Sequence, residues 1–518
     1  MKYTRFNISL LTLIGFALFS LTTLGQAQDL NQKIRKLDEF YERAVQEWDV
    51  PGMAVAIVKD DSVLLAKGYG LKDINTGEKV NASTLFPIAS ITKSFTAAGL
   101  GILVDEGEIS WDDKVREYLP WFEVINPYVS SNVTIRDLLS HRSGLKTFSG
   151  DLLWYGTDYS REEVVRRAKH LEPAYGFREH YGYSNIMFIT AGEIIEVVSG
   201  MSWDAFMEEH FFDPLDMDRT VTSTDDLKDM PNVTTPHTTF EGETITIDFL
   251  NWDNIGGAGA IISSVDEMTA WLELNLNKGV YEDDTIFSEE VIRELWKPHT
   301  LQDVSPFSLA FFPSTHFKAY GLGWAMFDYH GKKVVNHSGG YDGIISQMAL
   351  VPEEKLGMIF LTNKNAYLIL PAMYQTLDAF LTDDSTDWSQ ALQPIKQYMD
   401  RQEEAREKEL EENKVEGTTP SLEPNDYTGT YKDEMYGKAK VFIEEGELMV
   451  QFLPAQKFKG ELKHYHYDVY TVEFKEFPSL PKGLATFTLN SKGKVDKLVI
   501  DVPNPDFDFT EMEFEKQD

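Results

Sequence analysis

Residues 86–98 are Phe86-Pro87-Ile88-Ala89-Ser90-Ile91-Thr92-Lys93-Ser94-Phe95-Thr96-Ala97-Ala98. The extended Phe-Pro dipeptide predicts a helix that begins near Ser90 and runs through apolar residues to a stop at Gly107. Ser90 and Lys93 stand three residues apart, so they share one face of this helix. A partly desolvated amine can take the proton of a serine hydroxyl, and the free N–H groups at a helix start can receive negative charge from a carbonyl under attack. The stretch therefore predicts a nucleophilic serine with its own base. The alternative is a helix-capping serine beside a solvated lysine.

The S-x-x-K spacing is not specific by itself, because it occurs four times in the chain. The other three copies begin at Ser143, Ser479 and Ser491. They fall in a glycine-interrupted loop, around a proline and in a predicted hairpin turn. Only Ser90 opens an apolar helix, so we single it out as the candidate nucleophile.

Length and composition limit the classes of protein to consider. The 518 residues exceed one ordinary core, so two or three domains are expected, and 42% hydrophobic residues with 21 prolines indicate ordinary globular material. The chain has no cysteine, which excludes disulfides, thiol chemistry and lipid attachment through an N-terminal cysteine. The formal net charge of −36 disfavours nucleic acid and anionic membrane surfaces as partners.

The first 27 residues have the pattern of a secretory signal peptide. Lys2 and Arg5 precede an apolar run from Ile8 to Leu24, and Gly25-Gln26-Ala27 ends in small residues. We expect cleavage after Ala27; an uncleaved membrane anchor is the alternative. Export without disulfides predicts a periplasmic or secreted protein of a bacterial envelope, with no stable membrane insertion after cleavage.

Residues 28–385 are predicted to form one α+β domain. An antiparallel hairpin follows a first amphipathic helix, a mostly helical region fills residues 111–279, and strands and a last helix return near the end. One antiparallel sheet would thus be assembled from both ends of the domain, flanked by the terminal helices, with a helical lobe inserted. The predicted elements are helices 30–48 and 368–381 and strands 53–58, 63–66, 333–336, 347–351 and 358–362.

Two further segments complete the predicted organisation. Residues 386–424 contain a charged helix-forming run and then Gly417-Thr418-Thr419-Pro420, which is typical of a helical, charged linker. Residues 425–518 alternate like antiparallel strands and predict a small all-β domain, either a sheet or a barrel. We see no catalytic cluster in that domain.

Two motifs downstream of Ser90 add chemistry to it. Tyr183-Ser184-Asn185 lies just ahead of a predicted helix; a tyrosine near an ammonium can serve as a general base, and an amide can orient a lysine and a substrate amide. His337-Ser338-Gly339-Gly340 lies at the end of a predicted strand, where a bare backbone lets a substrate lie antiparallel to the sheet edge and leaves an N–H free for an oxyanion.

S-x-x-K, then Y-x-N, then a strand with a polar residue and Ser-Gly together resemble the serine β-lactamase and penicillin-binding protein superfamily, with the class C β-lactamase branch as the best match. The resemblance covers roughly residues 30 to 382 and implies a β-lactamase/transpeptidase-like fold. The stretches that also resemble this branch are 138–145, 212–217, 256–264, 320–324 and 361–363.

The resemblance implies a role for each motif residue. Ser90 would be acylated, and Lys93 with Tyr183 would activate it; Tyr183 would also direct the deacylating water. Asn185 would hold Lys93 and the substrate amide, and the backbone N–H groups of Ser90 and Gly340 would form the oxyanion hole. No metal or cofactor is implied. The remaining substrate-binding positions would be His337, Ser338 and Gly339.

One position departs from the family pattern. Members that hydrolyse antibiotics or cleave D-Ala-D-Ala usually carry lysine where this chain has His337, and a histidine is mostly neutral at pH 7. Anionic β-lactams are therefore disfavoured. Family members with histidine at this position include D-amino-acid-specific peptidases and esterases, so the resemblance favours hydrolysis of small esters or of peptides, D-residue peptides included, over a β-lactam substrate. The alternatives are a β-lactamase or D-alanyl-D-alanine carboxypeptidase, and a non-catalytic binding or assembly protein on the same scaffold. The sequence makes no prediction of the oligomeric state.

Two features stay open in the sequence. His141 could be a third catalytic group, but its place in a family loop motif favours a structural hydrogen-bonding role. The C-terminal β domain could shape the active-site entrance or mediate assembly, and a stabilising or spacing role is an equal alternative.

Overall fold

The computed structural model describes residues 28–383 and 386–517. The predicted signal peptide, residues 1–27, lies outside the described residues. Within the described ranges, no single helix is long and apolar enough to cross a membrane, although one bent helix pair, Asn185–Ser199 with Trp203–Phe212, passes by length and composition.

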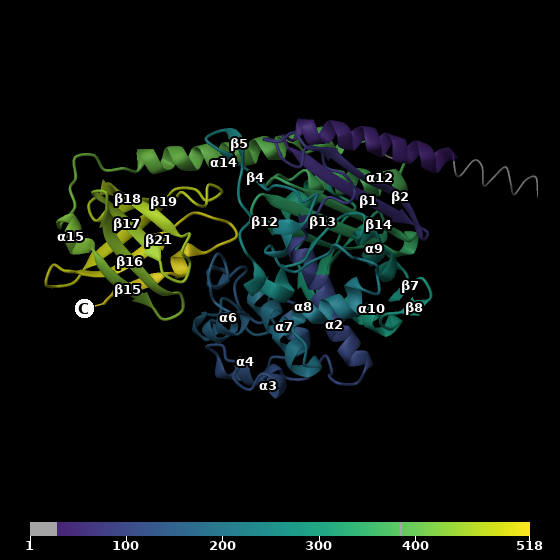
Figure 1. The fold of residues 1–518 in the computed structure, drawn as a ribbon, viewed down its shortest axis with the longest axis horizontal. Coiled ribbons are helices and arrows are strands. Elements are labelled where there is room, and N and C mark those ends of the chain that lie inside the picture. The colour runs from purple at the N-terminus through teal and green to yellow at the C-terminus, as the bar shows by residue number, and fades with distance from the viewer. Residues whose placement is uncertain (1–27, 384–385, 518) are drawn as a thin grey trace, which may run out of the picture.

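An antiparallel sheet of eight strands forms the frame of the first domain (Figure 1). Its order is β2-β1-β14-β13-β12-β11-β10-β9, so β1 from the start of the domain pairs with β14 from its end. The strands are β1 (Gly52–Lys59), β2 (Ser62–Gly70), β9 (Thr300–Gln302), β10 (Lys318–Tyr320), β11 (Ala325–Tyr329), β12 (Lys332–Tyr341), β13 (Ile344–Val351) and β14 (Leu356–Thr362). Three short edge strands, β9 to β11, were not expected from the sequence, because they are too brief to show a period of two.

Both faces of the sheet are buried, as the side-chain alternation along β1 shows. The odd-numbered residues from Met53 to Ile57 enter a core with the helix over residues 28–47 and with α12 (Ile369–Leu381). The even-numbered residues between Ala54 and Val58 enter a second core that contains α2 (Thr92–Asp105) and α9 (Met268–Leu276). Burial of two successive faces explains why β1 is a continuous apolar run.

The helical lobe lies between β2 and β9 in the chain and covers the second face of the sheet (Figure 1). Short strand pairs join its segments: β3 (Phe86–Pro87) pairs with β6 (Ile262–Ser263), β4 (His237–Phe240) with β5 (Glu243–Thr246), and β7 (Val280–Tyr281) with β8 (Asp284–Thr285). Its other helices are α3 (Val115–Tyr118), α4 (Pro127–Asn132), α5 (Ile135–Leu139), α6 (Arg161–Arg167), α7 (Asn185–Ser199), α8 (Trp203–Met207) and α10 (Glu289–Leu295). The short α11 (Pro306–Phe311) follows β9 and packs against the core on the first face of the sheet.

The C-terminal domain is a closed barrel of eight antiparallel strands in sequence order, with β15 paired to both β16 and β22. Closure leaves no free strand edge, which is how a small sheet avoids edge-to-edge association. The predicted fold class, a β-lactamase-like α+β domain followed by a small all-β domain, is therefore confirmed. The barrel strands are β15 (Gly429–Asp433), β16 (Gly437–Glu444), β17 (Glu447–Phe452), β18 (Lys459–His466), β19 (Val469–Phe474), β20 (Gly483–Leu489), β21 (Val495–Asp501) and β22 (Glu513–Lys516).

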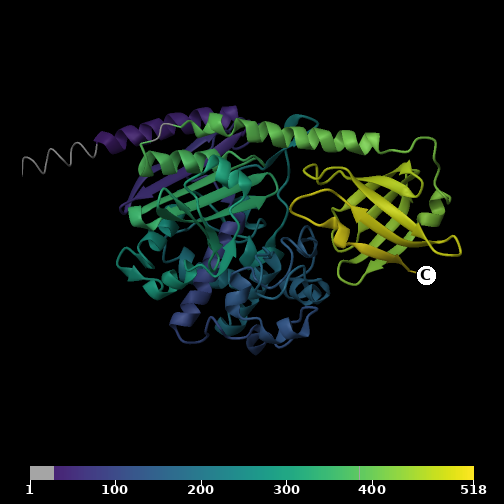
Figure 2. The same ribbon diagram turned by 180° about the vertical axis from the view of Figure 1, so that it is seen from behind.

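The segment between the two domains is largely helical. After α13 (Trp388–Ala391), the long α14 (Gln393–Glu412) runs along one edge of the molecule toward the barrel in both views (Figures 1 and 2). Its start is tied to the N-terminal helix, because Trp48 Nε1 donates to Ser389 Oγ at 3.0 Å and Gln393 Nε2 donates to the Glu47 carbonyl at 3.3 Å. Contacts with the end of the N-terminal helix thus fix α13 and the start of α14, and α14 leads the chain to the barrel.

The barrel docks on the lobe through an aromatic contact. Tyr155 of the lobe stacks on Phe507 with ring centroids 4.0 Å apart and packs against Phe458 and Phe477. Asp158 N also donates to the Pro454 carbonyl at 2.8 Å. Buried aromatics carry large contact areas, so this contact fixes the barrel beside the lobe segment around Tyr155.

Candidate active site

Ser90 lies in a single 3-10 turn, Ala89–Ile91, directly before α2. The preceding residue, Ala89, has a φ of 47°, in the left-handed region that non-glycine residues rarely adopt. Such a conformation costs roughly 1–2 kcal/mol and is typical of residues whose surroundings hold a functional group in position. The strained turn therefore sets the direction in which Ser90 leaves the chain.

Lys93 is fully buried on the first turn of α2, and its amine has three acceptors. Lys93 Nζ lies 3.0 Å from Ser90 Oγ, 2.7 Å from Asn185 Oδ1 and 2.7 Å from the Ala258 carbonyl. Two of these acceptors are carbonyl oxygens, which cannot donate. A neutral Lys93 would give its two N–H groups to them and turn its lone pair to the Ser90 hydroxyl, so the geometry suits a base.

Burial lowers the pKa of Lys93 well below its usual value, and the nearby Asp151 carboxylate opposes this shift in part. A buried ammonium loses its hydration, which favours the neutral amine. The amine is thus both placed and tuned to accept the proton of Ser90.

The Asn185 amide is oriented by a carboxylate that the sequence did not indicate. Asn185 is the first residue of α7, and its Nδ2 donates to Asp151 Oδ2 at 2.6 Å, which leaves Oδ1 to face Lys93. Trp154 Nε1 donates to the other Asp151 oxygen at 3.0 Å. Burial raises the pKa of Asp151 to about 7, and these two donors and the Lys93 charge limit the rise.

Tyr183 lies on the other side of Ser90. Its hydroxyl is hydrogen-bonded to the Ser90 side chain, and its ring faces Lys93, with Nζ 4.8 Å from the ring centroid. Burial raises the pKa of Tyr183 well above its usual value. The sequence suggested a tyrosine that loses its proton readily near an ammonium, whereas in the structure burial keeps the phenol protonated and lowers the pKa of Lys93 instead.

His141 supports the tyrosine segment. Its Nδ1 accepts a hydrogen bond from Ser184 N at 3.1 Å, and its ring lies 4.3 Å from that of Tyr183. Burial and the Lys93 charge lower the pKa of His141 well below its usual value, so it is neutral. These contacts agree with the structural role that we favoured for His141.

The His337-Ser338-Gly339-Gly340 motif lies inside β12, not at its end as expected, because the strand continues to Tyr341. A Cβ on Gly339 would lie 2.5 Å from the Ile88 carbonyl and 2.9 Å from Ser90 N, so only glycine lets the strand approach the nucleophile. β11 pairs with β12 only as far as Asn336, so the strand edge beyond it is open on that side. Ser338 and Gly340 are exposed there, next to Ser90.

His337 is buried and neutral. Its Nδ1 donates to the Ser338 carbonyl at 2.6 Å, so Nε2 is the acceptor for the Tyr320 hydroxyl at 2.7 Å. Burial and the Lys93 charge lower the pKa of His337 to about 3. The position therefore offers no positive charge at neutral pH, which strengthens the argument made from the sequence.

The comparison with known families agrees with this geometry. Residues 37–369 match the family described as Beta-lactamase. The chain belongs to the beta-lactamase family. The predicted resemblance is confirmed, and residues 413–516 match a second family, described as a domain of unknown function (DUF3471).

The relatives of this chain include a protein named as a hydrolase and a protein whose name states no activity. The unguisins hydrolase ungD of Aspergillus violaceofuscus is 30% identical over 412 residues, which are 73% of this chain and 71% of the relative. Protein flp of Staphylococcus aureus strain MW2 is 24% identical over 375 residues, 72% of this chain and 71% of the relative. The relatives of this chain thus include a protein named as a hydrolase, and the match covers about seven tenths of both chains.

Solved structures share the fold of this beta-lactamase family member. The octameric penicillin-binding protein homologue from Pyrococcus abyssi superposes with a TM-score of 0.59 at 22% identity, over 93% of this chain and 100% of that one. A structure titled SurE gives a TM-score of 0.55 at 18% identity, over 94% of this chain and 99% of that one. At these identities the likeness concerns the fold.

The structure brings together every candidate site residue that the family resemblance named, and adds groups that the sequence did not reveal. Asp151 lies in a loop without a motif, and Tyr320 was noted only as part of a Tyr-Gly-Leu-Gly-Trp stretch. The Ala258 carbonyl belongs to the stretch 256–264, which was noted for its resemblance to the family and not for a contact with Lys93. Among the described residues, no group of three or more His, Cys, Asp or Glu side chains is placed to hold a metal ion.

The barrel of this beta-lactamase family member touches the loop that carries Asp151. Glu511 accepts hydrogen bonds from Ser149 Oγ at 2.5 Å and from Gly150 N at 2.9 Å, and Tyr436 of the barrel donates to it at 2.5 Å. Lys146 also pairs with Asp508 at 2.7 Å. The barrel therefore holds the backbone that positions Asp151 and, through it, the Asn185 amide.

Replacing Glu511 by alanine is expected to lower kcat about 10- to 100-fold, because a small displacement of the Asp151 loop misaligns Asn185 and Lys93. Three hydrogen bonds to a carboxylate are lost, so the midpoint of thermal unfolding should also fall by several degrees. Steady-state kinetics and calorimetry check both effects. Glu513→Ala is the matched control, because the Glu513 side chain is exposed and forms a surface ion pair with Lys497. Equal kinetics of Glu511→Ala and Glu513→Ala would contradict a positioning role for the barrel.

Proposed function

We propose that this chain is an exported serine hydrolase that forms an acyl-enzyme on Ser90 and hydrolyses small esters, amides or peptides, D-residue peptides among them. The observation that carries the proposal is the buried Lys93 amine 3.0 Å from Ser90 Oγ, with carbonyl oxygens as its two other partners. A serine held this way is activated as a nucleophile rather than used as a helix cap. Export is inferred from the predicted signal peptide and the absence of cysteine.

In acylation, Ser90 Oγ bonds to the substrate carbonyl carbon and its proton passes to Lys93. The backbone N–H groups of Ser90 and Gly340 would stabilise the oxyanion that forms. As the bond to the leaving group breaks, the leaving group takes a proton by way of the Tyr183 hydroxyl, which remains protonated in the resting site. Lys93 is then neutral again.

In deacylation, a water molecule bonds to the same carbonyl carbon and gives its proton to the Tyr183–Lys93 pair. The bond from the carbon to Ser90 Oγ breaks, and Ser90 recovers a proton. Every step uses groups that lie within one buried hydrogen-bond network around Lys93. No additional reactant is required.

The substrate class is inferred from His337 and from the relatives. A neutral residue at this position attracts a substrate carboxylate weakly, which favours neutral esters and peptides over anionic β-lactams. A relative that shares 30% identity is named as a hydrolase of unguisins, so hydrolysis by this scaffold has a precedent in the family.

The test is the intact mass of the mature protein after brief exposure to a penicillin, a D-Ala-D-Ala peptide and a short-chain nitrophenyl ester. We expect an adduct that maps to the proteolytic peptide containing Ser90, or turnover, with the ester or the peptide. Penicillin as the most reactive compound would point to a β-lactamase instead. No adduct and no turnover with any of the three would favour a binding protein on this scaffold.

His337→Lys is expected to raise kcat/KM about tenfold for substrates with a carboxylate on the leaving-group side, because a cation replaces a neutral ring. The same variant should leave kcat/KM for a neutral ester little changed. The measurement is a pair of ester substrates that differ only in a terminal carboxylate or carboxamide. His337→Gln, which keeps the position neutral, is the control. Equal carboxylate preference in the two variants would remove the argument from charge.

A further inference from the structure

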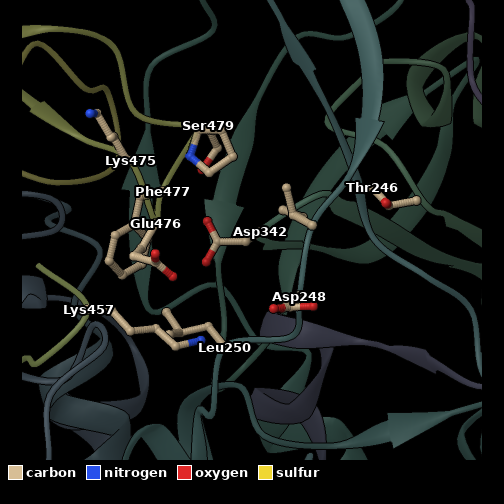
Figure 3. A pocket seen from close by; sticks show the side chains of 11 residues that line it. Thr246, Asp248, Leu250, Asp342, Lys457, Lys475, Glu476, Phe477 and Ser479 are labelled. Carbon is tan, nitrogen blue, oxygen red and sulfur yellow. The ribbon is translucent and has the colours of Figure 1, made fainter.

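A cavity of about 220 Å³ lies where the sheet domain meets the barrel, just beyond the end of β12 (Figure 3). One wall is the segment after β5, and the other is the barrel loop between β19 and β20. Both domains are needed to form it. Its lining includes Asp248, Leu250, Asp342, Lys457, Phe477 and Ser479.

Asp342 is the polar group at the centre of this cavity. Figure 3 shows its carboxylate pointing into the space between Asp248 and the barrel residues Phe477 and Ser479. Asp342 Oδ1 accepts a hydrogen bond from the Tyr155 hydroxyl at 2.8 Å. The other oxygen, Oδ2, is buried and meets no donor at normal bonding geometry among the described residues. A buried carboxylate oxygen without a donor in hydrogen-bonding geometry is unfavourable, although the Ser479 hydroxyl and the Lys457 charge both act to lower the pKa of Asp342.

The charge around the cavity favours a cation. Asp248, Asp342 and Glu476 line it together with Lys457 and Lys475, and Lys475 is already paired with Glu461 at 3.3 Å. The carboxyl of Asp506 lies close enough to raise the pKa of Asp342 further. That pKa reaches about 6, mainly through burial, so Asp342 is ionised at neutral pH.

The position of Asp342 relates the cavity to the Ser90 region. Ser338 and Gly340 are the exposed positions of β12, and Asp342 is the first residue of the turn that follows this strand. Its Cα lies within about 7 Å of that of Gly340, because each residue of the chain spans at most about 3.6 Å. A substrate that runs antiparallel to β12 with its scissile carbonyl at Gly340 has its leaving group toward His337 and its acyl group toward Asp342.

The geometry points to the Asp342 cavity as a subsite for a protonated amine on the acyl side of the substrate, such as the free N-terminus of a dipeptidyl group. This inference rests on the proposed function, because it takes Gly340 as the place of the scissile carbonyl. An amine at this distance would donate to Asp342 Oδ2 and would fill the space between the two domains. The barrel would then select substrates by closing one wall of the subsite.

The first experiment measures hydrolysis of Ala-Ala 4-nitroanilide, as the L,L and the D,D compound, each with a free and with an acetylated N-terminus. A charge-assisted hydrogen bond predicts kcat/KM about 10- to 100-fold higher for the free amine at pH 7.5. In Asp342→Asn this ratio should fall toward one. Asp283→Asn removes the same charge from an exposed turn and should keep the wild-type ratio. Equal rates for free and acetylated compounds in the wild-type protein would overturn the inference while leaving the hydrolase intact.

The second experiment separates the subsite from catalysis. Calorimetric titration of the same compounds into full-length Ser90→Ala should give a Kd about tenfold lower for the free amine, and the difference should vanish in Ser90→Ala/Asp342→Asn. If the free amine binds more tightly but the wild-type protein turns over none of the compounds, the proposed function is overturned and the amine subsite is kept. Equal Kd values, or no binding of either compound, would overturn the subsite.

Discussion

Ser90→Ala is expected to lower turnover of the best ester or peptide substrate by a factor of at least about 10³, because removal of an activated nucleophile leaves only binding and oxyanion stabilisation. Substrate should still bind, since the side chain that is removed is small. The measurement is kcat by single turnover under saturating substrate, together with the loss of the adduct in the intact mass. Thermal unfolding of the variant should stay close to that of the wild type.

The chain contains its own control for this experiment. Ser491 and Lys494 have the same spacing as Ser90 and Lys93, but they lie in the exposed turn between β20 and β21, where Asn490 N donates to the Lys494 carbonyl. Ser491→Ala should therefore leave kcat unchanged. A Ser90→Ala protein with wild-type kcat would refute the acyl-enzyme on Ser90.

Lys93→Met should lower kcat by about 10²–10⁴, the usual contribution of a positioned general base. Methionine keeps most of the volume of the side chain and removes the amine that lies 3.0 Å from Ser90 Oγ. Lys93→Arg should be as inactive, because a guanidinium cannot become neutral at this pH. Lys494→Met is the matched control and should retain full activity.

The pH dependence gives Lys93→Met a second readout. Burial lowers the pKa of Lys93 in the folded protein, so the neutral base is present above that lowered pKa and kcat should rise with pH through it and then level off. Between the lowered pKa and the usual value, the unfolded chain binds a proton that the folded chain does not, so the free energy of unfolding should increase with pH. Both slopes should be absent in Lys93→Met. A wild-type rate that falls as pH rises through neutrality would contradict a neutral Lys93 as the base.

Much of the catalytic centre could be predicted because its parts are local motifs. Ser90 and Lys93 share a helix turn, and Tyr183 and Asn185 flank a helix start. Gly339 lies in a predicted strand, where the absence of a side chain leaves the backbone accessible. The chemistry of each motif can be inferred from residues that are close together in the sequence. The helix and hairpin at the start of the domain, and the strands near its end, were likewise visible as periodic apolar runs.

Asp151, Ala258 and Asp342 could not be found in this way. Asp151 reaches Asn185 from a loop 34 residues earlier, and the Ala258 carbonyl reaches Lys93 across 165 residues. Asp342 accepts a hydrogen bond from Tyr155 and lines a cavity together with the barrel loop at Phe477 to Ser479. No period or spacing links such positions, because chain folding alone brings them into contact.

The amino-acid sequence by itself determined the family, the α+β architecture with its all-β appendage, and the side chains available for chemistry, because these depend on local propensity and on motifs read within single elements. The tertiary structure alone decided the pKa shifts at the site and the cavity between the two domains. Burial lowered the pKa of Lys93, kept Tyr183 protonated and left His337 neutral, since each shift arises mainly from the loss of water around a group. The docking of the barrel on the loop around Tyr155 formed the cavity that receives Asp342, because a cavity exists only where two surfaces meet.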